Sequence, residues 1–130
     1  MIKSIDHIVL TAQNIEQTIT FYCDVLGMQL ESFTPADGSP ARKASKFGDQ
    51  KINLHDAKAP YVPNAKNPTT GAIDICFLSD LPIQEWIKRF DLHNIPIESG
   101  PMQKTGATGP LMSIYVRDPD GSLIEISNQI

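Results

Sequence analysis

The stretch YVRDPDGSLIEI, residues 115–126, decides the fold of this chain. An alternating apolar run ends at Arg117, and the residues Asp-Pro-Asp-Gly that follow are typical of a tight turn between two strands. The second strand, residues 122–127, carries Glu125 between two isoleucines. Charged side chains seldom lie in so apolar a strand unless they are paired or bind a ligand. The stretch therefore predicts a hairpin whose last strand presents a functional carboxylate.

The same order of segments occurs twice along the chain. The first half predicts a strand at 4–11, a helix that Asn14 caps and Gly27 ends, and strands at 28–33, 42–47 and 51–55. The second half predicts a strand at 73–79, a helix that begins near Pro82, and strands at 95–98, 111–117 and 122–127. Residues 57–71, rich in proline, asparagine and glycine, predict a linker or loop. We therefore expect one α+β domain, residues 1–130, with a first module at 1–56 and a second at 72–130.

Two histidines and two carboxylates take matching places in these halves. His7 opens the first strand and Asp74 the corresponding later strand, while His55 and Glu125 lie toward the ends of the fourth and last strands. Imidazole and carboxylate suit Zn, Ni, Co, Mn or Fe(II). Four protein ligands of an octahedral ion would leave two positions open for water or substrate, as a catalytic metal requires. The pattern predicts a divalent metal site with His7, His55, Asp74 and Glu125 as ligands.

Each of these residues also has a plainer interpretation. His7 fits a core histidine with satisfied ring nitrogens, and His55 fits a solvated strand end. Asp74 fits a turn cap or an outer partner of a metal ligand. Arg117 suits either a contact to an anionic substrate or a solvated strand end. Trp86 lies on the apolar face of its helix and favours a place in the core.

Composition excludes several classes of protein. The net charge is -4 and lysine and arginine are scattered, which argues against a nucleic-acid partner. No apolar run approaches the roughly 18 residues of a membrane span, and residues 1–6 lack the apolar stretch of a signal peptide. The two cysteines, Cys23 and Cys76, lie in apolar segments and are predicted to be reduced core thiols of a cytoplasmic protein.

Three segments together resemble the vicinal oxygen chelate superfamily, which includes glyoxalase I, extradiol dioxygenases and bleomycin-resistance proteins. The matching segments are IDHIVL at 5–10, ITFYCDVLGM at 19–28 and the stretch at 115–126. The resemblance covers nearly the whole chain and is nearest to small glyoxalase-domain proteins of the virulence type. It implies two βαβββ modules that form a curved eight-stranded mixed sheet around a cleft. It also implies ligands at His7, His55, Asp74 and Glu125, a small-molecule substrate and a homodimer.

The order of the four residues departs from that of bacterial glyoxalase I. That enzyme usually has His, Glu, His, Glu along its chain, whereas this chain has His, His, Asp, Glu. The set still contains two nitrogen and two carboxylate ligands. Asp74 is one methylene shorter than the glutamate it resembles in type.

The resemblance leaves three functions open. The first is a metal-dependent lyase or isomerase of the glyoxalase type, similar to lactoylglutathione lyase, acting on a substrate with vicinal oxygens. In it the metal would polarise a carbonyl, and Glu125, with Asp74 second, would move a proton on the neighbouring carbon. The second is an extradiol-type ring-cleaving dioxygenase in which His7, His55 and Glu125 hold Fe(II). The third is a non-catalytic protein that binds a small molecule or antibiotic, as bleomycin-resistance proteins do.

Overall fold

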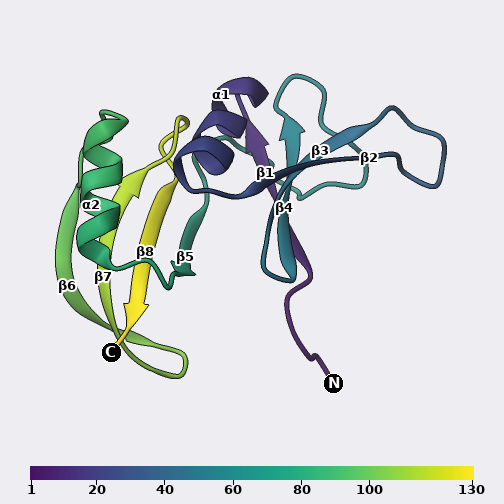
Figure 1. Cartoon of the computed structure of the whole chain (residues 1–130). Helices are drawn as coiled ribbons and strands as arrows, with labels where there is room; N and C mark the ends of the chain where they lie inside the picture. The colour runs from purple at the N-terminus through teal and green to yellow at the C-terminus, as the bar shows by residue number, and fades with distance from the viewer. The chain divides into compact units, whose positions relative to one another are not determined.

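A computed structural model describes all 130 residues of the chain. It divides into two compact units, Met1–Thr70 and Gly71–Ile130, and each unit is described by itself. Both units have the order strand, helix, strand, strand, strand, so the predicted pair of βαβββ modules is confirmed. The strands form two four-stranded sheets, one in each unit (Figure 1).

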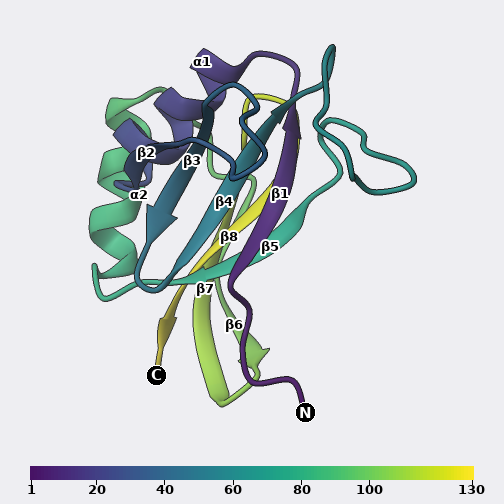
Figure 2. The ribbon, with the colours of Figure 1, turned by 90° about the vertical axis from the view of Figure 1, so that its right-hand side faces the viewer.

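The first unit builds its sheet around a parallel pair of strands. Its strands are arranged in the order β1-β4-β3-β2, where β1 runs parallel to β4 and the other neighbours are antiparallel. Figure 2 shows β1, β4 and β3 side by side. The elements are β1 His7–Ala12, α1 Ile15–Ile19, η1 Thr20–Val25, β2 Gln29–Phe33, β3 Arg42–Phe47 and β4 Gln50–Asp56.

The first helix begins and ends where the sequence predicts. Asn14 caps it, since its side-chain oxygen accepts a hydrogen bond of 3.0 Å from the backbone N–H of Gln17. Gly27 ends it with a φ of 81°, a left-handed conformation that glycine adopts without strain. The second half, η1, is a π-helix rather than an α-helix. Its Cys23 Sγ lies 3.5 Å from Ser45 Oγ of β3, which identifies the sheet face that the helix covers.

The second unit repeats this plan. Its strands take the order β5-β8-β7-β6, with β5 parallel to β8. Helix α2 lies against one face of this sheet (Figure 1). The elements are β5 Asp74–Leu78, α2 Ile83–Leu92, β6 Ser99–Gly106, β7 Gly109–Arg117 and β8 Leu123–Gln129.

Helix α2 packs through the apolar face that its sequence period predicts. Ile83, Trp86 and Phe90 are buried, and the rings of Trp86 and Phe90 stack with centroids 5.5 Å apart. The Trp86 ring N–H donates a hydrogen bond of 2.8 Å to Ser79 Oγ, so the buried indole has a partner. Trp86 is therefore a core residue, as predicted.

Two sequence predictions about the second unit are wrong. The strand expected at 95–98 begins only at Ser99, because β6 is an edge strand that tolerates Pro101 and shifts its register between Ser99 and Met102. Cys76 was expected in the core but is exposed. Both cysteines are free thiols in the structure.

The segment between β4 and β5 contains neither helix nor strand at residues 57–71. At its end, Gly71 has a φ of 71°, and a Cβ atom there would overlap the backbone carbonyl of Asp120. Only glycine fits this close approach to the turn that follows β7. No helix of the structure is long and apolar enough to cross a membrane.

Candidate functional site

The sheet face opposite α2 in the second unit is polar. Along β8, Ile124 and Ile126 are buried and Asn128 contacts the start of α2, so the intervening side chains point to the other face. Glu125 lies on this other face, next to Cys76 of β5 on one side and Tyr115 of β7 on the other. We call this set the polar face of the second unit, and it comprises Asp74, Cys76, Ser113, Tyr115, Glu125 and Ser127.

Hydroxyl groups hold the Glu125 carboxylate. Its Oε2 accepts hydrogen bonds from Ser113 Oγ at 2.7 Å and from Ser127 Oγ at 3.1 Å. No lysine or arginine of the second unit forms an ion pair with it. Glu125 is thus a half-buried carboxylate stabilised by neutral donors, and its negative charge remains available to a cation.

The negative charge of Glu125 contributes to a raised pKa of Tyr115. Burial raises the pKa of its phenol to about 12, with further contributions from a hydrogen bond to Glu125 and from the charges of Glu125, Cys76 and Asp74. The phenol therefore stays protonated at neutral pH beside the carboxylate. Asp74, exposed at the start of β5, belongs to the same electrostatic neighbourhood.

Strand register shows how Asp74 and Glu125 are related. Asp74 pairs with Leu123 and Cys76 pairs with Glu125 across the parallel strands β5 and β8. The two carboxylates therefore lie on one face of adjacent strands, two residues apart along the strand direction. Standard strand spacings place their Cα atoms about 8 Å apart.

The first unit contains the same relation, but with Asn53 in place of His55. His7 pairs with Lys51 and Val9 pairs with Asn53 across β1 and β4. His7 and Asn53 are therefore offset by two residues on one face, as Asp74 and Glu125 are. The Oδ1 atom of Asn53 is buried and has no hydrogen-bond partner.

The prediction that His55 occupies the place equivalent to Glu125 is wrong by two residues. His55 pairs with Thr11 of β1, four residues beyond His7, which corresponds to about 13 Å along the strand. Side chains stand roughly perpendicular to a sheet, so the two rings do not approach each other as ligands of one ion would. The overlooked signal is the pattern Ile-Asn-Leu at 52–54, which matches Ile-Glu-Ile at 124–126. Metal binding by His55 stays a prediction without support from this register.

Neither plain interpretation of the histidines holds. His55 is only 5% exposed, so it is not a solvated strand end. His7 is exposed, so it is not a core histidine. Its Nδ1 lies 2.8 Å from the Asp6 carboxylate, an arrangement that orients the ring and leaves Nε2 available to a metal or ligand.

The donor atoms within each unit suit a divalent ion in type. The structure gathers no group of three or more histidine, cysteine, aspartate or glutamate side chains that would hold a metal. It supplies two donor pairs instead, His7 with Asn53 in the first unit and Asp74 with Glu125 in the second. Imidazole, amide oxygen and carboxylate are all ligands of such ions, and the buried Oδ1 of Asn53 lacks any other partner.

Arg117 has a structural role. Its Nε and Nη2 atoms donate to the two carboxylate oxygens of Glu98 at 3.0 and 2.9 Å, and its Nη1 donates to the Gly121 carbonyl at 3.1 Å. These contacts lower the pKa of Glu98, first through the hydrogen bonds from the guanidinium. Arg117 therefore stabilises the turn after β7 through its hydrogen bonds with Glu98 and Gly121.

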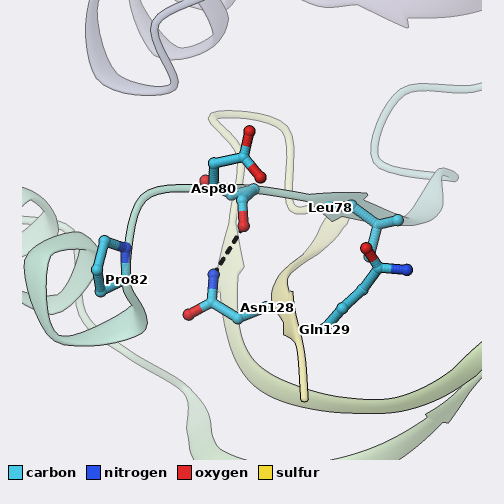
Figure 3. Close-up of a pocket in the computed structure, with 6 residues that line it drawn as sticks. Leu78, Asp80, Pro82, Asn128 and Gln129 are labelled. Atoms are coloured by element: carbon cyan, nitrogen blue, oxygen red, sulfur yellow. Dashed lines mark hydrogen bonds between the residues drawn. The ribbon is translucent and has the colours of Figure 1, made fainter.

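A hollow of about 540 Å³ in the second unit lies apart from these residues. It lies where β5 ends and α2 begins, and is lined by Leu78, Ser79, Asp80, Pro82, Asn128 and Gln129 (Figure 3). The side-chain amide of Asn128 is already hydrogen-bonded within the protein, since its Nδ2 donates to the carbonyls of Ser79 and Leu81 at 2.8 and 2.9 Å. None of the predicted site residues lines the hollow, so we assign it no chemistry.

Comparison with known proteins identifies the family. The chain is 46% identical over 130 residues to Virulence protein STM3117 of Salmonella typhimurium, covering 100% of this chain and 87% of that protein. The crystal structure of that protein superposes with a TM-score of 0.89, covering 100% of this chain and 99% of the other. The chain is also 42% identical to the Glyoxalase domain-containing protein RDO1 of Mycosarcoma maydis, over 98% of this chain and 69% of that protein.

A lactoylglutathione lyase has the same fold at lower identity. The crystal structure of that enzyme from Agrobacterium tumefaciens is 26% identical, with a TM-score of 0.69 over 98% of this chain and 95% of the other. A family model of the Glyoxalase/Bleomycin resistance protein/Dioxygenase superfamily matches residues 4–126. This chain belongs to that superfamily.

Proposed function

We propose that this protein is a metal-dependent lyase or isomerase of the glyoxalase type, acting on a small substrate with two adjacent oxygens. The observation that carries the proposal is the Glu125 carboxylate, held by two serine hydroxyls on a polar sheet face without a cation. The likeness to a lactoylglutathione lyase supports this class of reaction.

We propose two pairs of metal donors, each within one unit: His7 with Asn53 in the first and Asp74 with Glu125 in the second. Asn53 replaces His55 in the set because the register gives it the place equivalent to Glu125. A bound divalent ion would polarise a substrate carbonyl and stabilise the negative charge that develops on its oxygen.

Glu125 is the group that would move the proton. A carboxylate accepts a proton from the carbon next to a polarised carbonyl when it lies within reach of that carbon. The hydrogen bonds from Ser113 and Ser127 keep it oriented for this task. Tyr115, neutral at physiological pH, adds a hydrogen-bond donor on the same face. Asp74 contributes negative charge there.

Turnover of the methylglyoxal–glutathione hemithioacetal tests the reaction directly. We expect activity with Ni, Co, Zn or Mn, and a loss of about 10²- to 10⁴-fold in kcat for Glu125→Gln. Asp80→Asn is the matched control, because Asp80 is a carboxylate just beyond β5 that lies in the hollow and outside the polar face. No turnover with any of these ions would contradict the glyoxalase reaction.

Metal titration tests the ligand assignment separately. We expect Asn53→Ala to weaken binding of the activating ion by about tenfold or more, and His55→Ala to leave it nearly unchanged. The reverse result would restore His55 as the ligand. Oxygen uptake with Fe(II) and a catechol would favour the ring-cleaving dioxygenase, and a protein that binds no metal would favour the non-catalytic binder.

A further inference from the structure

We propose that Arg42, Tyr61 and His55 form a subsite on the first unit that binds a carboxylate group of the substrate. The proposal deepens the proposed function, because it names the substrate class as a small carboxylic acid. It rests on contacts within one unit.

Strand pairing brings Arg42 and His55 together. In the antiparallel pair β3–β4, Lys43 lies opposite Leu54. One step further along the two strands, Arg42 therefore comes opposite His55. Both point away from the face that α1 and η1 cover, since Ser45 and Ile52, which pair with each other, lie on the helix side.

Tyr61 lies against both of these side chains. The central guanidinium carbon of Arg42 lies 3.8 Å from the centroid of the Tyr61 ring. The same ring meets the imidazole of His55 edge to face, with centroids 5.2 Å apart. The tyrosine therefore fixes a guanidinium and an imidazole as neighbours.

The charge of Arg42 has no counter-ion in the first unit. Arg42 forms no ion pair, and its Nε is buried without a hydrogen-bond partner. Asp37 is near enough for the Arg42 charge to help lower its pKa, although the larger causes are its hydrogen bonds with Ser39. A guanidinium without an ion pair, whose Nε is buried and unpartnered, favours the binding of an anion, and its planar fork matches a carboxylate.

His55 adds a second polar group. Its Nδ1 is buried and unpartnered while the side chain is only 5% exposed. An imidazole ring offers an N–H to a carboxylate oxygen. An orphaned nitrogen of this kind gains a partner when an acid binds.

Nuclear magnetic resonance titration with acetate tests the subsite. The probes are the Arg42 Nε–H and the His55 ring nitrogens, observed in the chelator-treated protein at constant ionic strength. We expect saturable shifts with acetate and none with acetamide, its uncharged counterpart. Arg42→Gln should weaken acetate binding by about tenfold or more. Arg42→Lys, which keeps the charge and loses the fork, should weaken it less.

Lys46→Gln is the matched control. Lys46 lies on the same face of β3, and its substitution removes the same charge without touching Tyr61 or His55. Equal losses in Lys46→Gln and Arg42→Gln, or equal binding of acetamide and acetate, would overturn the proposal. Tighter binding of inorganic phosphate than of acetate would reject a carboxylate as the ligand. Because no metal or turnover enters this measurement, its failure is distinguishable from failure of the proposed reaction.

Discussion

Asn53 stands where the second unit has Glu125, so the two halves differ by one negative charge at this position. The sequence alone favoured His55 because it closes the apolar run at 51–55, much as Glu125 lies toward the end of the run at 122–127. Asn53, flanked by Ile52 and Leu54, matches Glu125 better, because Glu125 also lies between two apolar residues. The register shows only that Asn53, and not His55, is the residue of β4 equivalent to Glu125.

Tyr115 supplies a prediction about pH at this scale. Its pKa of about 12 in the folded chain exceeds the ordinary value of 10.0, so the folded state holds the phenolic proton more tightly than the unfolded state. The resulting stabilisation is complete below pH 10 and is lost as the pH rises toward 12. Absorbance titration of the phenol should show the late ionisation, which Tyr115→Phe removes. Glu125→Gln should lower this pKa only partly, since burial is its largest cause. An unchanged value in Glu125→Gln would contradict the contact.

At the scale of elements, most helices and strands follow from sequence period and turn residues. The predicted first helix, α2 and the hairpin of β7 and β8 all lie where the pattern indicates. The strand β6 does not, because Gly100, Pro101 and Gly106 look like strand breakers when neighbouring strands are unknown. An edge strand has one free side and accepts such residues, which local sequence does not reveal.

Asn128 couples one strand to one helix, and its removal should weaken that junction. Its side chain accepts a hydrogen bond of 2.8 Å from the Ile83 N–H and donates to the carbonyls of Ser79 and Leu81. We expect Asn128→Ala to lower the free energy of unfolding by about 2 kcal/mol, measured by denaturant titration, because three backbone groups lose their partner. Gln129→Ala, at the exposed neighbour, should change it by less than about 0.5 kcal/mol. Similar effects of the two substitutions would contradict this role.

At the scale of the whole molecule, the duplication was visible in the order of segments. The matching places of the four predicted ligands were less secure, because equal counts along a chain assume loops of equal length. Lys51 lies 44 positions after its pairing partner His7 in the first unit, and Leu123 lies 49 positions after Asp74 in the second. Because the loop lengths differ between the repeats, His55 lies out of register with Glu125.

Metal removal provides a test at the same scale. An ion bound only by the folded chain stabilises it, by about 2.7 kcal/mol when its concentration is 100 times the dissociation constant. A chelator should therefore lower the Tm of the metal-loaded protein, and Glu125→Gln should reduce this dependence. A Tm that ignores both metal and chelator would contradict the assigned ligands and favour a protein that only binds small molecules.

The buried indole of Trp86 gives the second unit a spectroscopic signature of its own. It is the only tryptophan of the chain, and its ring is packed on Phe90 and bound to Ser79 within the second unit. Intrinsic tryptophan fluorescence therefore reports on the second unit alone, whereas far-ultraviolet circular dichroism records the backbone of both. A fluorescence transition that coincides with the dichroism transition would show that the duplicated halves unfold as one cooperative unit. Two separate transitions would show which half loses its structure first.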